Sequence, residues 1–286
     1  MTPRVDRPAS PVIGAFWGTL AALGIGASDL FGRRIVQRVG PVTAAFVMQV
    51  VGAMVAAMAV TVVGGRPTLL DLLWGALSGL GMAIGLGCYF AGLAASSASV
   101  VSPIVATLLA VLPYGYALAR GGEASGIAVA GAVVAFVGLA LVAGGSTAAD
   151  GIRAGVLWGL VSGTAYGIAT GVLVEVTEAA GAWPAVSQRL AAVMALGASA
   201  AALRAPAVPP PGLRLNGLGA GVAAGLTSVF LLLGLEADAP PAVVTNSMFP
   251  VFTVAVGAAF YGDAVSRRQL VGIAVALIGI AFVVGA

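Results

Sequence analysis

The sequence predicts an all-α integral membrane protein with ten transmembrane helices in two inverted five-helix repeats. Three observations support this fold class: the composition, the spacing of apolar runs and an internal duplication. Of the 286 residues, 60% are hydrophobic and only 8% are charged, and the mean hydropathy is +1.09. A soluble protein of this length needs far more charge to cover its surface, so the composition places the chain in a membrane.

The first repeat is expected in residues 1–148. Its apolar runs of about 20 residues are each long enough to cross a hydrocarbon core of about 30 Å. The first run could be taken for a signal peptide, but its glycine spacing recurs in the second half, so we keep it as a mature span. The expected spans cover about residues 11–32, 42–63, 70–95, 98–119 and 125–144.

The second repeat is expected in residues 149–286. Its apolar runs have the same length, and connections rich in charge, Gly or Pro separate them, as expected at a membrane surface. The expected spans cover about residues 154–176, 184–203, 213–235, 241–261 and 268–285.

Two ladders of small residues, spaced four apart, support the duplication. A spacing of four keeps residues on nearly one helix face, and small residues let helices approach closely in lipid. A glycine-rich phosphate loop is the alternative, but no strand-like run precedes the later ladder and no Lys lies in it. The later ladder is Gly155, Gly159, Gly163, Gly167 and Gly171, and the earlier one is Gly14, Gly18, Ala22 and Gly26.

The halves also match near their ends, at Gly122-Glu123-Ala124 and Gly262-Asp263-Ala264. Because five is odd, a duplicated unit of five spans lies upside down relative to its partner. Inverted repeats of this kind are a recurrent plan of secondary transporters, which place the substrate site near the midplane between the halves. We expect Glu123 and Asp263 to cap the fifth and tenth helices, where a carboxylate meets unpaired N–H groups.

These repeats, their Gly-acid pairs and Phe249-Pro250-Val251 ahead of Asp263 resemble the EamA-type members of the drug/metabolite transporter superfamily. The resemblance implies ten helices around a central cavity and movement of a small metabolite, often outward, by alternating access. The sequence departs from the family pattern in having Asp263 where Glu is usual and Ala110 where the second half has Pro250. Small multidrug relatives have an essential Glu in mid-membrane in their first helix. No acid lies at that depth here, so their proton coupling is not carried over to a matching residue.

The residue types exclude most other classes of function. With no His and a single Cys, the chain cannot form an internal disulfide, a His-dependent hydrolase site or a metal site with nitrogen ligands. We therefore expect no catalytic residue, no metal and no cofactor. All the basic residues are Arg and they flank the spans, so no basic patch indicates nucleic acid. The expected partners are the lipid bilayer, a small-molecule metabolite and a coupling proton, in a monomer or homodimer.

Charges inside spans are costly, so each one is a candidate for function. Asp29 lies late in the first span. It is either an interfacial acid paired with Arg33 one helical turn later, or a cavity carboxylate that binds a cation or a proton. Its counterpart in the second half is Tyr166, an asymmetry that a binding site would show.

Gln49 and Arg189 are expected at nearly matching depth in the second and seventh spans. Arg189 either extends to the interface or pairs with a backbone carbonyl, or it contacts a carboxylate-bearing substrate. Tyr89 in the third span and Asn246 in the ninth are further candidates for lining a cavity. For Asn246 ordinary interhelical hydrogen bonding is the alternative, and Pro250 predicts a bend just after it.

The prediction is thus a multi-pass transporter of the bacterial inner membrane that exports a small metabolite by alternating access. The alternative is a protein that translocates a lipid-linked substrate or modifies lipid. The arginines divide five against eight between the two faces, which by the positive-inside rule would place the termini outside. The family resemblance implies cytoplasmic termini, and we follow the resemblance.

Overall fold

The computed structural model describes residues 11–121, 126–143, 149–237 and 239–284, and within these ranges it contains helices and no strand. The first half forms α1 (Pro11–Arg38), α2 (Pro41–Val63), α3 (Leu69–Ala95), α4 (Ala98–Ala119) and α5 (Gly126–Ala143). The second half forms α6 (Ala149–Gly171), α7 (Trp183–Ala202), α8 (Arg214–Ala237), α9 (Ala239–Asn246), α10 (Phe249–Tyr261) and α11 (Arg267–Val284). Short 3-10 helices connect α6 to α7 and precede α8.

A helix occupies each of the ten apolar runs. In the described residues, seven stretches are long and apolar enough to cross a membrane, and α5 contains a shorter apolar stretch. The all-helical membrane fold is therefore confirmed. Of the ten predicted spans, this criterion supports seven. α8 and α11 are less uniformly apolar than α5, because α8 begins with Arg214 and includes Asn216, and α11 begins with two arginines.

The ninth run is divided into α9 and α10, with Ser247 and Met248 between them. Pro250 lies in the first turn of α10 and has no N–H group to bond to the preceding helix. The N–H group of Val251 instead bonds to the carbonyl of Met248 at 3.0 Å, which starts the new helix. The bend predicted from Pro250 is thus a break in the helix.

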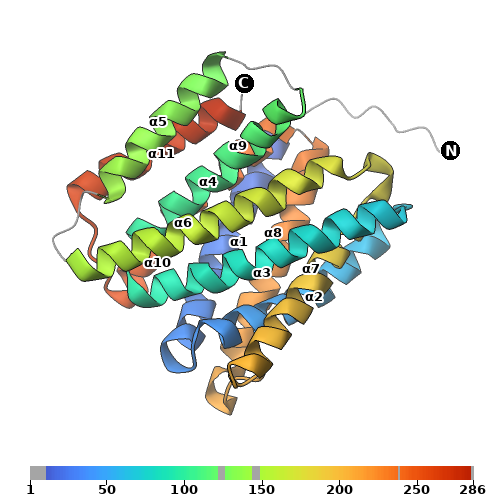
Figure 1. Ribbon diagram of the computed structural model, residues 1–286, viewed down its shortest axis with the longest axis horizontal. Coiled ribbons are helices and arrows are strands. Elements are labelled where there is room, and N and C mark those ends of the chain that lie inside the picture. Colours follow the sequence, from blue (N-terminus) through green and yellow to red (C-terminus); the bar gives the residue numbers. More distant parts are fainter. Residues whose placement is uncertain (1–10, 122–125, 144–148, 238, 285–286) are drawn as a thin grey trace.

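Helices of the first half pack beside helices of the second half across the molecule (Figure 1). α5 and α11 lie side by side at one edge of the molecule, and α2 and α7 lie at the opposite edge. Between them, α6 packs on α3 and α4, whereas α1 packs on α8, α9 and α10. Each first helix of a repeat therefore packs mainly on helices of the other repeat.

The α5–α11 contact shows how the two halves are oriented. A Cβ atom at Gly131 would lie 2.7 Å from the carbonyl oxygen of Gly279, and one at Gly138 would lie 2.7 Å from that of Gly272. The residue numbers increase along one helix as they decrease along the other, so the two helices are antiparallel. These are corresponding helices of the two halves, as the matched sequence around Glu123 and Asp263 indicates.

The glycines of α6 face α4 along its whole length. Gly155 faces Ser96, just before α4 begins, Gly163 faces Leu108, and Gly171 faces Tyr116 near the end of α4. Between these positions, Gly159 lies against Ile104 and Gly167 lies against Leu108 and Leu112. The ladder therefore forms one continuous contact surface between helices of different halves.

The earlier ladder has the corresponding position on α1. Gly18 faces Ala242 and Thr245 of α9, and Gly26 faces Phe252 of α10. The carbonyl oxygen of Gly14 lies beside Gly234 of α8. The two ladders thus pack on corresponding spans of the opposite halves.

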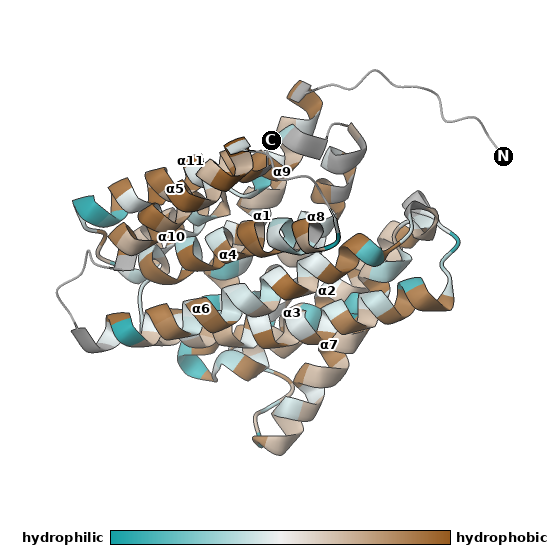
Figure 2. Cartoon of the chain, turned by 45° about the horizontal axis from the view of Figure 1, so that its top comes forward, coloured by the Kyte–Doolittle hydropathy of each residue, from teal (hydrophilic) through white to brown (hydrophobic). Residues whose placement is uncertain are grey.

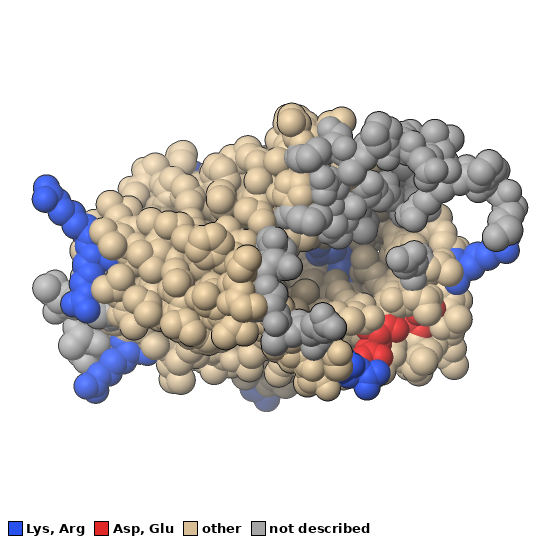
Figure 3. All heavy atoms as spheres, turned by 90° about the horizontal axis from the view of Figure 1, so that it is seen from above, with Lys and Arg blue, Asp and Glu red and all other residues tan. Residues whose placement is uncertain are grey.

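The surface is apolar between two charged ends. Figure 2 shows hydrophobic residues covering much of the outer helices, α5 and α11 among them. Figure 3 shows basic side chains projecting at both ends of the long axis, with few charges between them. An apolar belt bounded by arginines is the distribution that a bilayer requires.

Candidate functional site

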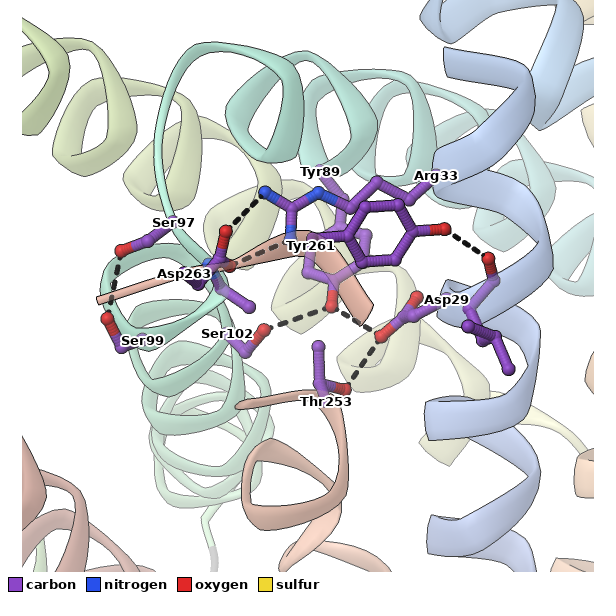
Figure 4. A network of polar contacts seen from close by, with 11 residues as sticks. Asp29, Arg33, Tyr89, Ser97, Ser99, Ser102, Thr253, Tyr261 and Asp263 are labelled. Atoms are coloured by element: carbon purple, nitrogen blue, oxygen red, sulfur yellow. Dashed lines mark hydrogen bonds and ion pairs between the residues drawn. The ribbon is translucent and has the colours of Figure 1, made fainter. Parts of the chain in front are cut away.

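Asp29 is the centre of a buried polar cluster that joins four helices (Figure 4). Its Oδ2 atom accepts hydrogen bonds from the hydroxyl groups of Tyr89 and Thr253, both at 2.7 Å. The hydroxyl of Ser102 lies 3.0 Å from that of Tyr89, and it donates because the Tyr89 proton points to Asp29. Asp29 is only 4% exposed, and its described hydrogen bonds use Oδ2 alone. The carboxylate is thus fixed by hydroxyl groups from α3 and α10.

Of the two alternatives for Asp29, the ion pair with Arg33 is not formed. The guanidinium of Arg33 instead forms two parallel hydrogen bonds to the carboxylate of Asp263, at 2.7 and 2.8 Å. It also lies over the ring of Tyr261, 4.6 Å from the ring centre, and the Tyr261 hydroxyl donates to the carbonyl of Leu30. Two parallel bonds satisfy a carboxylate better than an i to i+4 contact between flexible side chains can.

Asp263 does not cap α11, the tenth predicted span, although the sequence predicts that it does. Its Oδ2 atom accepts a hydrogen bond of 2.9 Å from the backbone N–H of Ala98, the first residue of α4. α11 is capped instead by Ser266 and Gln269, whose side chains bond to each other's backbone N–H groups at 2.9 and 3.2 Å. Asp263 therefore caps a helix of the other half. Glu123, its counterpart, lies outside the described residues.

Arg189 and Gln49, expected at matching depth, are in contact. Arg189 Nη1 donates to Gln49 Oε1 at 2.9 Å, and Nη2 donates to Ser228 Oγ at 2.6 Å and to the carbonyl of Ala224 at 3.1 Å. The two long side chains are 5% and 2% exposed. All these partners are neutral and come from α2 and α8, so within the described residues no acid forms an ion pair with Arg189.

Tyr166 of α6 packs against α3, the helix that also carries Tyr89. Its ring packs against Gly85 of α3, where a Cβ atom would lie 2.8 Å away. In the described part of the chain its hydroxyl has no hydrogen-bond partner. Figure 3 shows a hollow on one face in which basic atoms are visible.

Asn246 does not join these clusters by any hydrogen bond among the described residues. It is the last residue of α9, and its Oδ1 atom is buried without a hydrogen-bond partner. A buried amide oxygen without a partner is destabilising, by about 1 to 3 kcal/mol. The position beside the helix break is the one the sequence predicts, but the interhelical hydrogen bond considered for it is absent at this atom.

Several residues of the site are missing from the sequence prediction. Ser102 and Thr253 are ordinary small polar residues in apolar runs, and only the three-dimensional contacts give them a role. Asp71 is different, because Thr68-Leu-Leu-Asp71 is a recognisable capping box, and the structure shows both of its bonds. Its further bonds to Thr177 of the other half, at 2.8 and 3.2 Å, have no sequence signal.

The fold and the site together define a helical membrane protein with two antiparallel halves and buried charged groups between them. The chain belongs to the EamA-like transporter family, which it matches twice, over residues 12–144 and 153–285. This agrees with the resemblance noted in the sequence. A known crystal structure of another protein aligns over 96% of this chain and 96% of its own, with a TM-score of 0.63 and 20% identity. At this identity the likeness shows the fold alone. No curated protein sequence matches the chain significantly.

Proposed function

We propose that this protein is a secondary transporter that exports a small metabolite across the bacterial inner membrane by alternating access. The family and the apolar helices support a membrane transporter of the drug/metabolite type, and a transporter family is consistent with the absence of catalysis. The antiparallel α5–α11 contact supports ten spans in two inverted repeats. The alternative, a lipid-translocating or lipid-modifying protein, lacks a supporting cluster of acids among the described residues.

The observation that carries the proposal is the pair of buried charged residues contributed by different halves. Asp29 comes from α1 and Arg189 from α7. Among the described residues, each of them forms hydrogen bonds only with neutral groups. Charged residues without an ion-pair partner are expensive inside a membrane and mark substrate or ion pathways. We assign Gln49, Tyr89, Tyr166 and Asn246 as further residues lining the pathway.

The proposed mechanism is a relative movement of the halves about the two glycine surfaces. α6 slides or rocks on α4, and α1 on α9 and α10, because glycine leaves no side chains to interlock at these contacts. Asp29 is the proposed proton-coupling acid. Its hydrogen-bond donors Tyr89 and Thr253 come from different halves, so a change in its protonation alters a bond between the halves.

The first experiment compares metabolites inside and outside cells that overproduce the wild type or the Asp29→Asn, Arg189→Ala double variant. A small compound that accumulates outside only with the wild type supports export and these site residues. Gly87→Ala is the matched control, because a Cβ atom at Gly87 would meet nothing within 4 Å. If wild type, both variants and empty vector give identical profiles while the proteins are inserted and abundant, the export proposal is wrong.

Proton coupling has a separate test. Wild type and Asp29→Asn are compared in proteoliposomes with and without a pH gradient, using the compound named by the first experiment. We expect the gradient to accelerate transport by the wild type and to have no effect on Asp29→Asn. If the pH gradient accelerates transport by Asp29→Asn as much as transport by the wild type, Asp29 is not the coupling acid.

A further inference from the structure

Most arginines of the chain lie at one end of the helix bundle. The ion pair described above joins the end of α1 to the segment between α10 and α11. The hydroxyl of Thr43, at the start of α2, donates to the carbonyl of Pro206, after α7, at 2.8 Å. A Cβ atom at Gly151 of α6 would lie 3.4 Å from the carbonyl oxygen of Ala95, where α3 ends. This end is called the arginine face here and is defined by Arg34, Arg38, Arg153, Arg204, Arg214, Arg267 and Arg268, all of them exposed.

The arginine face carries a large excess of positive charge. Together with Arg33, eight arginines lie at this end but only two acids, Asp150 and Asp263. Counting by sequence had assigned Arg189 to the opposite end, but it is buried between helices and belongs to neither end. In the part of the chain that the structure describes, the opposite end has fewer arginines than acids. These residues are Arg66, Arg120, Asp71, Glu175, Glu178 and Glu236.

Three arginines of this face lie where a helix disfavours them. Arg214 begins α8, and Arg267 and Arg268 begin α11. The start of a helix carries partial positive charge, so a cation there is unfavourable. No described acid forms an ion pair with any of the three. An anion from outside the protein can balance both these arginines and the helix starts.

The surroundings of these arginines identify the kind of anion. Leu203 precedes Arg204 and is 68% exposed, and Leu215 follows Arg214 and is 80% exposed. Adjacent apolar and basic side chains, both exposed, fit the boundary between acyl chains and phosphate groups in a bilayer. A soluble acidic protein or a nucleic acid would leave the leucines without an apolar partner. The red acidic atoms visible in Figure 3 lie at the opposite end of the molecule.

We propose that the arginine face binds the phosphate groups of anionic phospholipids at the cytoplasmic surface of the membrane. α1 then begins, and α11 ends, at the outer surface, which reverses the orientation that the family resemblance implies. Short basic connections remain in the cytoplasm, and the negative potential of the cytoplasmic leaflet attracts each nearby arginine. A guanidinium also meets a phosphate with two parallel hydrogen bonds. The proposal rests on the membrane location of the chain and not on transport.

The first test determines which end faces the cytoplasm. The sequence contains no Lys, so the amino group ahead of α1 is the only primary amine. Right-side-out and inside-out membrane vesicles that contain the wild type are treated with a membrane-impermeant, amine-reactive biotin reagent, and biotin on the purified protein is measured. We expect labelling in right-side-out vesicles and none in inside-out vesicles. Labelling only in inside-out vesicles, or equally in both, overturns the proposal.

A cysteine at the arginine face provides the reciprocal measurement and keeps the test decisive if the amino group is blocked. Gly212→Cys is introduced into a Cys88→Ala chain, because a Cβ atom at Gly212 would meet nothing within 4 Å and this residue lies just before α8. We expect a membrane-impermeant maleimide to react with it in inside-out vesicles and not in right-side-out vesicles. The opposite result overturns the proposal.

The second test measures the contact with anionic lipid. The purified protein is placed in nanodiscs of phosphatidylcholine, with or without phosphatidylglycerol of the same acyl chains, and thermal unfolding is recorded. We expect phosphatidylglycerol to raise the unfolding midpoint of the wild type, and high salt to reduce this shift. A variant with Arg204→Gln, Arg214→Gln, Arg267→Gln and Arg268→Gln should lose about half of the shift or more, because it lacks four basic groups of the face.

The matched control removes the two described arginines of the opposite end. Arg66→Gln with Arg120→Gln breaks the Arg120–Glu175 pair and so lowers stability in both lipids, but it should leave the shift caused by phosphatidylglycerol unchanged. No shift in the wild type, as expected if the face binds an acidic protein or a nucleic acid, rules out the lipid surface. An equal loss of the shift in variants of both ends rules it out as well.

Discussion

At the residue scale, Arg33 and Asp263 form a bidentate ion pair that joins the two halves. Their side chains are each 8% exposed, and Asp263 also bonds to the N–H group that begins α4. Breaking a buried ion pair by removing one partner costs about 3 to 5 kcal/mol, because the remaining charge stays buried. The pair therefore fixes the ends of α1, α4 and α10 to one another.

We predict that Asp263→Asn lowers the free energy of unfolding by about 3 kcal/mol. The measurement is denaturant or thermal unfolding of the purified protein. Arg120→Gln is the matched control, since the Arg120–Glu175 pair is 62% and 19% exposed and its loss should cost about 1 kcal/mol or less. Equal losses of unfolding free energy in Asp263→Asn and Arg120→Gln would contradict the assignment of Arg33–Asp263 as a buried, stabilising ion pair. The Arg33→Gln, Asp263→Asn double variant should lose less than the sum of the single losses.

At this scale the sequence predicts which residues are polar and buried better than it predicts their partners. The depths of Gln49 and Arg189 follow from counting along apolar runs, and the structure brings them into contact. Asp29 and Arg33 are one turn apart, yet each bonds elsewhere. Helices α3 and α10 bring hydroxyl groups to Asp29, and the connection after α10 brings the Asp263 carboxylate to Arg33, and no local pattern reveals these partners.

At the element scale, the glycines of α6 are graded in how closely they contact α4. A Cβ atom at Gly167 would lie 2.7 Å from the carbonyl oxygen of Leu108, whereas one at Gly171 would lie 3.5 Å from its nearest neighbour, in Tyr116. The backbone of α4 cannot yield at Gly167 without moving the helix. At Gly171 a methyl group makes an ordinary contact.

We predict that Gly167→Ala destabilises the protein by about 1 to 3 kcal/mol and slows transport, whereas Gly171→Ala changes both little. Unfolding and proteoliposome uptake of the two variants provide the measurement. The two sites lie on nearly the same helix face and undergo the same chemical change. They differ in the distance to α4 and in that Gly171 is the last residue of α6. A Gly171→Ala variant as impaired as Gly167→Ala would show that spacing on this surface does not control the movement.

The helices themselves are well predicted from apolar runs, since a span in lipid must satisfy its backbone hydrogen bonds internally. The break between α9 and α10 is predicted as a bend from Pro250, but its sharpness depends on the carbonyl of Met248 replacing the lost partner. The partner of each glycine ladder could not be predicted, because a small-residue face shows that another helix approaches and not which one.

For the whole molecule, the two halves are tied together at both ends. Asp263 joins the halves where α3 ends and α4 begins, and Asp71 joins them where α3 begins, through Thr177. The backbone N–H of Arg66 adds a bond of 2.7 Å to the carbonyl of Ala179 beside Asp71. α3 has 27 residues and so separates these ties by about 40 Å. Alternating access would require each tie to open in turn.

We predict that Asp263→Asn and Asp71→Asn each increase access to the interior from the end they weaken. Cys88 is the single cysteine and lies about one helical turn after Gly85, which packs against Tyr166, so the native chain reports access through its reaction with a membrane-impermeant maleimide. In oriented vesicles each variant should label faster from one side, about tenfold if the tie is worth about 1.4 kcal/mol. Labelling that accelerates from the same side in both variants, or in neither, would contradict the two-tie arrangement.

The α5–α11 contact bears on how such a chain can arise by gene duplication. If two antiparallel copies of one five-helix unit paired, their last helices would meet on the two-fold axis, and each codon would set two symmetry-related contacts at once. In the fused chain Gly131 and Gly279 are encoded separately, yet a methyl group on either would meet the backbone of the other helix. Because the clash is with backbone atoms, no substitution of the partner residue relieves it, and each glycine has to be kept separately. Asp29 and Tyr166, which occupy equivalent places without touching, are free to diverge one at a time, and the asymmetry of the interior follows from that freedom.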